Sequence, residues 1–193
     1  GTSIYRRSDT GRFSAVSAYY DHQDQIVGGF TRQALEDAVR SVDGLRMQEA
    51  EKQGRFKLSF YTDAARLDEV ADQIQKTLAA SEAPYSIIRS VDPFTGDGLI
   101  DLLPAGVSKA HALQWWVQDN GYGPESVVFA GDSGNDLAVL TAGYQSIVVA
   151  NADRSVAREA YRAHRAAGWK NRLYLARGRA SSGVWEGCRW FGL

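Results

Sequence analysis

The stretch Ser126–Leu140, SVVFAGDSGNDLAVL, decides the fold of this 193-residue chain. Its apolar first part predicts a buried strand that ends near Gly131, and we expect a short helix over residues 135–140. Asp132 then lies at the carboxyl end of the strand and Asp136 in the first helical turn, so both carboxylates face one crevice. Two such carboxylates suit a hard cation such as Mg²⁺, which takes oxygen ligands. The alternative is an Asp-rich turn that only caps a helix.

The chain after Pro104 alternates helical and strand patterns around this stretch. The predicted strands are near-continuous apolar runs, which are typical of a parallel sheet covered on both faces. Ligands of such doubly wound sheets bind beyond the carboxyl ends of the strands, where Asp132 stands. We expect helices over residues 109–120, 155–166 and 181–192 and strands over residues 126–130, 146–150 and 172–176.

The part before Pro104 has a different pattern. Residues 31–103 predict a helix with Thr31 as its N-cap, two strands, a helix over residues 67–80 and two more strands. No crossover helix separates the paired strands, so a compact α+β unit with a mainly antiparallel sheet is expected. Residues 13–30 show no clear pattern, and we expect residues 21–25 to be solvated.

Composition excludes several classes of protein. A net charge of −1 gives no electrostatic footprint for nucleic acid or a membrane surface. No apolar run approaches the roughly 20 residues that span a bilayer. Cys188 is the single cysteine, which excludes a disulfide framework and favours a reducing, cytoplasmic location.

Lys109 is a second candidate for function, because it follows Ser108 at a predicted helix start. The N-terminus of a helix already carries partial positive charge, so a lysine there is unfavourable unless an anion binds. The alternative is a solvated surface lysine. Asn135 can offer an amide to such an anion. Asn151 is read mainly as a turn residue, with support of a metal site as the alternative.

A lysine at a helix start, one βα step before an apolar strand that ends in GDSGND, resembles the haloacid dehalogenase (HAD)-like phosphatases. Residues 55–63 (RFKLSFYTD), residues 100–113 (IDLLPAGVSKAHAL), the initial GTSIY and residues 173–192 make the chain similar to the sucrose-phosphate phosphatase family. The resemblance covers essentially the whole chain. It implies a partial Rossmann-like core of residues 1–7 and 104–193, with residues 8–103 as an inserted α+β cap.

The same resemblance implies a Mg²⁺-dependent phosphomonoesterase that passes through an aspartyl-phosphate. It makes Lys109 the lysine that neutralises the nucleophile and the phosphoryl group. Asp132 becomes a metal ligand, and Asp136 either binds the ion or supports a group that does. Ser133 and Asn135 organise the loop.

The sequence departs from the family pattern at the nucleophile. The family carries its nucleophilic and general-acid aspartates in an Asp-x-Asp-x-Thr stretch, and none occurs here. We expect that two βα units, about 60 residues at roughly 30 residues per unit, precede this chain in the complete enzyme. The chain as given therefore has no nucleophile to name.

The resemblance places sugar binding in the cap, through a Glu-Gln pair and a lysine four residues later. Gln53 and Lys57 match, but Lys52 replaces the glutamate, and Glu51 stands one residue earlier. Sucrose phosphate is therefore in question, and a related substrate such as mannosylfructose phosphate is an alternative. Lys57 can also be read as an ordinary exposed strand lysine.

Two hypotheses follow for the whole protein. The first is a phosphatase of a sugar phosphate, in particular a disaccharide phosphate. The second is a non-catalytic phosphatase-like domain that docks to or regulates a sugar-phosphate synthase. The remaining aromatic and histidine residues receive no functional role: Trp185 and Trp190 are predicted to pack the last helix, and His164 shares no ligand spacing with the other histidines.

Overall fold

The computed structural model describes all 193 residues as two compact units, Gly1–Ser108 and Lys109–Leu193. The division falls close to the predicted change at Pro104. Residues 1–7 belong by their contacts to the first unit, and their assignment to the core stays a prediction. None of the helices combines the length and the apolar character needed to cross a membrane.

The first unit begins with a hairpin and a helix that the sequence did not reveal. Strands β1 (Tyr5–Arg7) and β2 (Phe13–Ala15) pair antiparallel, and helix α1 (Ser17–Val27) follows. The expectation that residues 21–25 are solvated is wrong for Gln23, which is fully buried and donates to the carbonyl of Thr2 at 2.9 Å. The helix has no side-chain N-cap, and its few apolar residues give a weak pattern, so local sequence carried little signal.

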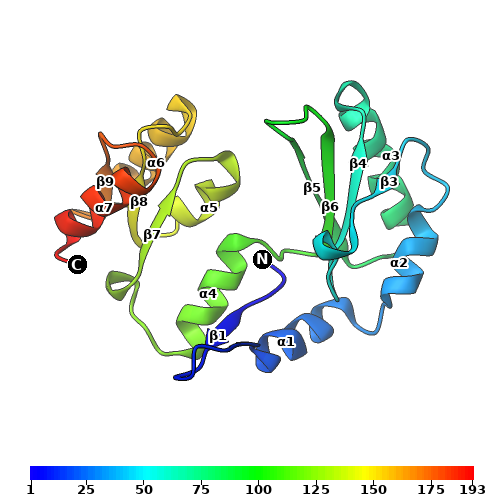
Figure 1. Ribbon diagram of the computed structural model, residues 1–193, viewed down its shortest axis with the longest axis horizontal. Coiled ribbons are helices and arrows are strands. Elements are labelled where there is room, and N and C mark those ends of the chain that lie inside the picture. The colour runs from blue at the N-terminus through cyan, green and yellow to red at the C-terminus, as the bar shows by residue number, and fades with distance from the viewer. The chain divides into compact units, whose positions relative to one another are not determined.

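The predicted α+β unit is confirmed in the rest of this unit. Its four-stranded antiparallel sheet has the order β3-β4-β6-β5, and helices α2 and α3 cover one face (Figure 1). The core between them contains Leu35 and Ile74 from the helices and Leu58 and Ile100 from the sheet. The elements are α2 (Arg32–Val39), β3 (Arg46–Met47), β4 (Leu58–Thr62), α3 (Leu67–Ala80), β5 (Tyr85–Val91) and β6 (Gly98–Pro104).

The second unit is the predicted α/β arrangement. Strands β7, β8 and β9 form a parallel sheet in that order. Val148 and Leu173 face the side of α6, and α7 packs on the opposite face (Figure 1). The elements are α4 (Lys109–Asp119), β7 (Val128–Gly131), α5 (Leu137–Leu140), β8 (Gln145–Val148), α6 (Arg154–Ala166), β9 (Leu173–Leu175) and α7 (Ala180–Phe191).

Helix α7 approaches β8 closely because of its glycines. A Cβ atom on Gly187 would lie 2.5 Å from Ile147, a distance that side chains do not tolerate. The expectation that both tryptophans pack this helix is wrong for Trp185, which is 64% exposed. Trp190 stacks beside Tyr174 with ring centroids 5.3 Å apart. The small residues, and not the large aromatic ones, therefore make the buried face of α7.

Candidate active site in the second unit

The GDSGND turn is built on close contact between its first and last residues. Strand β7 ends at Gly131, where a Cβ atom would lie 2.6 Å from the Cβ of Asp136, so a glycine is required. The helix expected from residue 135 is split into a 3₁₀ turn, Gly134–Asp136, and the four residues of α5. Asp136 is thereby held beneath the turn.

Both carboxylate oxygens of Asp136 accept hydrogen bonds. One oxygen accepts from the backbone N–H groups of Asp132 (3.2 Å) and Ser133 (3.3 Å) and from the Ser133 hydroxyl (3.0 Å). The other accepts from Lys109 Nζ at 2.7 Å. Burial acts to raise the pKa of the Asp136 carboxyl, but these donors, with Lys109 foremost, lower it below its usual range. Of the two roles predicted for Asp136, these bonds favour the supporting one.

Lys109 is the first residue of α4 and reaches Asp136 across 27 residues of sequence. Its side chain remains 55% exposed, whereas that of Asp136 is 7% exposed. One N–H of the ammonium group points at a buried acceptor, and the other donors remain available to an anion. The ion pair explains how a lysine is tolerated at the start of a helix.

Asp132 lies exposed at the carboxyl end of β7, held from one side by Asn151. The Asn151 amide nitrogen donates to one Asp132 oxygen at 2.8 Å, and the other Asp132 oxygen makes no hydrogen bond. The side-chain oxygen Oδ1 of Asn151 accepts from the backbone N–H of Ala180 at 2.7 Å. Asn151 therefore connects the start of α7 to the Asp132 carboxylate. Sequence reasoning took Asn151 mainly for a turn residue. Its place directly beyond the next parallel strand was the signal for contact with Asp132.

A cavity of about 390 Å³ adjoins these side chains. Lys109, Asp132 and Asp136 supply its charged wall, and an apolar wall comes from β7, from Val149 after β8 and from α7, including Phe129 and Val184. Ser133 joins Asp136 in a capping box, and its predicted role in organising the loop stays a prediction. The Asn135 side chain is exposed and makes no hydrogen bond, and its predicted role stays a prediction.

The carboxylates of the turn fit a magnesium site in which the protein supplies few of the ligands. No group of three or more His, Cys, Asp or Glu side chains is arranged to hold a metal. Asp132 alone offers an accessible carboxylate oxygen without a hydrogen bond, since those of Asp136 are engaged. Mg²⁺ is commonly bound by one or two carboxylates, with waters and substrate phosphate completing its coordination. The donor set therefore fits Mg²⁺ with Asp132 as the ligand from this chain.

In the first unit, Lys57 lies beside Asp101 and Ser59, two residues that the sequence did not group with it. Lys57 Nζ lies 3.3 Å from the Asp101 carboxylate, and the Ser59 hydroxyl donates to the same carboxylate at 2.6 Å. Ser59 is fully buried. Its face of β4 is covered by the preceding loop, whose Lys52 carbonyl lies 3.2 Å from the Ser59 hydroxyl.

Gln53 uses its side chain to fix that loop. Its amide nitrogen donates to the carbonyls of Gln48 (2.8 Å) and Ser59 (3.0 Å), and its carbonyl accepts from the Ser59 N–H at 2.9 Å. These bonds leave little hydrogen-bonding capacity for a sugar. The sugar contact predicted for Gln53 is therefore less well supported than the one predicted for Lys57.

Comparison with known proteins identifies relatives of this chain. The family described as sucrose-6F-phosphate phosphohydrolase matches residues 1–192. A Nitrosococcus oceani protein named as a HAD-like hydrolase is 36% identical over 200 residues, covering 99% of this chain and 53% of that protein. The mannosylfructose-phosphate phosphatase of Agrobacterium fabrum is 28% identical over 169 residues, covering 86% of this chain and 62% of that protein.

Among solved structures, the sucrose-phosphatase of Synechocystis, determined with sucrose and phosphate, matches with a TM-score of 0.68. The match covers 100% of this chain and 71% of that one at 21% identity, and it supports the fold. The chain spans about half the length of the curated relatives that it matches, with coverage of 53% and 62% for the two described above.

Proposed function

The chain belongs to the sucrose-phosphate phosphatase family, and from this premise we propose that the whole protein hydrolyses the phosphate monoester of a sugar. The observation that carries the proposal is the Lys109–Asp136 pair beside the exposed Asp132, at the carboxyl edge of a parallel sheet. A lysine and a cation-binding carboxylate at one edge suit a phosphoryl group, whose negative charge must be stabilised during transfer.

Within this proposal, Lys109 binds and orients the phosphoryl oxygens. Its ammonium group is anchored through one N–H to Asp136, so its position is fixed before substrate arrives. Preorganised donors of this kind stabilise developing charge without reorganisation. Asp136 holds both the lysine and the backbone of the turn, and Ser133 closes the turn from the other side.

Asp132 is the residue of this chain that we assign to Mg²⁺, oriented by Asn151. When bound, the ion supplies positive charge next to the phosphoryl oxygens. The attacking carboxylate has no counterpart among these 193 residues; in this proposal it takes the phosphoryl group as the bond from phosphorus to the sugar oxygen breaks, the sugar oxygen gains a proton as the sugar leaves, and water then cleaves the aspartyl-phosphate to release phosphate.

Sugar recognition is assigned to Lys57 and Asp101 of the first unit. Both side chains are about one-third exposed or less, and they present a cation and an anion within 3.3 Å of each other. Such a pair can donate to and accept from sugar hydroxyl groups. The relative that acts on mannosylfructose phosphate supports a disaccharide phosphate as the substrate class.

The test is a phosphate-release screen over mono- and disaccharide phosphates, with protein made from the complete coding sequence and with Mg²⁺ present. We expect turnover that is highest on a disaccharide phosphate and that is lost when Mg²⁺ is chelated. Equal turnover on simple hexose phosphates would remove the disaccharide assignment. No turnover on any sugar phosphate would favour the non-catalytic domain that serves a synthase.

A further inference from the structure

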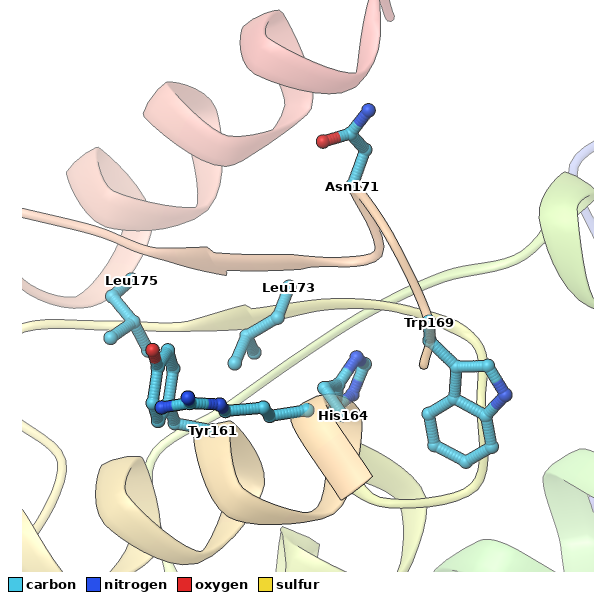
Figure 2. Close-up of a pocket in the computed structure, with 7 residues that line it drawn as sticks. Tyr161, His164, Trp169, Asn171, Leu173 and Leu175 are labelled. Atoms are coloured by element: carbon cyan, nitrogen blue, oxygen red, sulfur yellow. The ribbon is translucent and has the colours of Figure 1, made fainter. Parts of the chain in front are cut away.

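Six polar residues other than tyrosine are buried, and they differ in what their side chains contact. They are Gln23, Ser59, Thr62, Asp136, Ser146 and His164. The His164 ring holds the fold of its own unit, because its Nε2 lies 2.7 Å from the carbonyl oxygen of Leu140 and it packs edge-on against Trp169 (Figure 2). Ser59 is different, because its hydroxyl bonds to a partly exposed charged side chain, that of Asp101.

The Ser59 hydroxyl has one hydrogen and two neighbouring acceptors. Its Oγ lies 2.6 Å from Oδ1 of Asp101 and 3.2 Å from the carbonyl oxygen of Lys52. A hydrogen bond from a hydroxyl to an ionised carboxylate is roughly 2.5–2.7 Å long and about twice as strong as one between neutral groups. The hydrogen therefore goes to Asp101. Because Ser59 is fully buried, water does not compete for this bond.

The pairing of β4 with β6 brings the two side chains together. Ser59 and Asp101 lie directly opposite each other in the register of these strands. The backbone N–H and C=O of Ser59 are bonded to Gln53 and Gln48, on the other side of β4. Ser59 and Asp101 are therefore a pair without backbone hydrogen bonds between them, the kind in which facing side chains lie closest. Gln53 thus holds the residue that holds Asp101.

Lys57 completes the group from the same face of the chain, two residues before Ser59. Its backbone pairs with Gly54, and its Nζ lies 3.3 Å from each oxygen of the Asp101 carboxylate. Ser59 engages only Oδ1, so Oδ2 of Asp101 accepts from Lys57 alone. The Lys57 and Asp101 side chains are 27% and 34% exposed. Oδ2 and the remaining N–H groups of Lys57 are therefore open to a ligand.

We propose that Ser59 is a positioning residue for sugar recognition. Its hydroxyl fixes the Asp101 carboxylate in one orientation, so that Asp101 holds the Lys57 ammonium group and presents Oδ2 to a sugar hydroxyl. Groups that are ordered before a ligand arrives bind it more tightly, because less conformational entropy is lost on binding. The inference rests on the proposed function, in which Lys57 and Asp101 contact the sugar, and it adds a residue that is itself buried beyond the reach of the sugar.

The proposal is tested by the affinity of the complete protein for sucrose 6F-phosphate, measured by calorimetry without Mg²⁺. Ser59→Ala should raise Kd by about fivefold and Asp101→Ala by about tenfold, as expected when single hydrogen bonds of ordinary net strength are lost. The double variant should bind no more weakly than Asp101→Ala, because Ser59 acts only through Asp101. Affinity for inorganic phosphate should stay the same in all variants. The comparison needs no turnover, so it can fail separately from the proposed hydrolysis.

Three results would overturn the inference. Weaker binding by Asp101→Ala with unchanged binding by Ser59→Ala would overturn it alone. Unchanged binding by Asp101→Ala would overturn the sugar contact of Asp101, and the role of Ser59 with it. Losses that add in the double variant, or an equal loss of affinity for inorganic phosphate, would mean that Ser59 only supports the fold.

Urea unfolding checks that Ser59→Ala is folded before its affinity is compared. If this variant does not fold, Ser59→Cys takes its place. A thiol fills the buried position and is only a weak donor, so the same weakening of sugar-phosphate binding and the same absence of further loss beside Asp101→Ala are expected.

Discussion

The GDSGND turn of the second unit and the Gln53–Ser59 segment of the first unit both carry residues that the sequence marked for function. In the turn, Asp136 gathers Lys109 and the backbone of Asp132 and Ser133 around one buried carboxylate. In the Gln53 segment, the marked glutamine binds the backbone of Gln48 and Ser59 instead. The turn thus leaves Lys109 and Asp132 open to a ligand, whereas the segment leaves only Lys57 with its partner Asp101.

The difference shows what a short motif can specify. The turn is a local device, because its glycine, hydroxyl and carboxylate meet within six residues and their spacing determines the contacts. The contacts of Gln53 reach residues just as near in sequence, Gln48 and Ser59, but they depend on how the loop before β4 folds back against that strand. A residue matched by spacing in such a loop can therefore serve the fold and not the ligand.

The largest expected effect separates chemistry from recognition. If the whole protein has the proposed activity, Lys109→Ala in it should lower kcat on a sugar phosphate by about 10²–10³-fold, because a preorganised charge at the phosphoryl group is lost. Lys57→Ala should raise KM for the disaccharide phosphate and leave kcat nearly unchanged. Steady-state kinetics on both variants give the comparison, with Lys170→Ala, an exposed lysine that belongs to neither cluster, as the control. Unchanged kcat in Lys109→Ala would remove the lysine from the site.

The next effect concerns the two aspartates of the turn. Asp136→Ala leaves two backbone N–H groups and the Ser133 hydroxyl without their acceptor, and it should lower the free energy of unfolding by about 1–3 kcal/mol. Asp132→Ala removes an exposed side chain and should change stability by about 0.5 kcal/mol or less. Urea unfolding of both variants measures the difference. Equal losses would mean that Asp136 has no special part in holding the turn.

A third effect tests the structural role of Gln53. Gln53→Ala removes three hydrogen bonds between its side chain and the backbone and should cost about 1–2 kcal/mol of unfolding free energy. Its neighbour Lys52→Ala changes an exposed residue and should stay within about 0.5 kcal/mol of the parent. If Gln53→Ala is instead fully stable and loses affinity for the sugar phosphate, Gln53 is a ligand after all.

The sequence was sufficient for the architecture wherever apolar periodicity was strong. Helix α3 spans the predicted residues 67–80, strands β5 and β6 are the two strands predicted after it, and the parallel sheet follows from alternating helices and apolar strands. Helix α1 was missed because it has few apolar residues and no side-chain cap. Its burial comes from contacts such as that of Gln23 with Thr2, which local sequence does not announce.

The sequence predicted which residues form the site, but not which hydrogen bonds join them. Spacing placed Asp132 and Asp136 at one edge, and the structure adds that Asp136 holds the turn while Asn151 holds Asp132. Both connections depend on how side chains turn in the folded state. The contact between Asp101 and Ser59 was not predicted for the same reason, because the two residues pair across neighbouring strands and are 42 residues apart in sequence.

The smallest effect follows from a surface contact beside the Gln53 segment. The Tyr61 hydroxyl donates to the Glu49 carboxylate at 2.9 Å. Hydrogen bonds that the Glu49 carboxylate accepts from its own backbone N–H and from Tyr61 lower its pKa, and Glu49 in turn raises the pKa of Tyr61. A lowered carboxyl pKa stabilises the fold above the unfolded value of about 4.3 and loses that contribution as the pH falls. A raised tyrosine pKa stabilises the fold below about 10 and loses its contribution as the pH rises.

Tyr61→Phe should therefore be less stable than the parent between about pH 5 and 9, and the difference should shrink as the pH falls below about 4.3 and Glu49 becomes protonated. Thermal unfolding followed by circular dichroism across this range measures it. Both groups are exposed, so the difference in Tm should be small and should shrink further in high salt. A difference that is constant across the range would mean that the hydroxyl acts through packing and not through the Glu49 carboxylate. The Gln53 segment would then be held only by the hydrogen bonds of the Gln53 side-chain amide. This outcome would sharpen its contrast with the GDSGND turn, which is held by the charged carboxylate of Asp136.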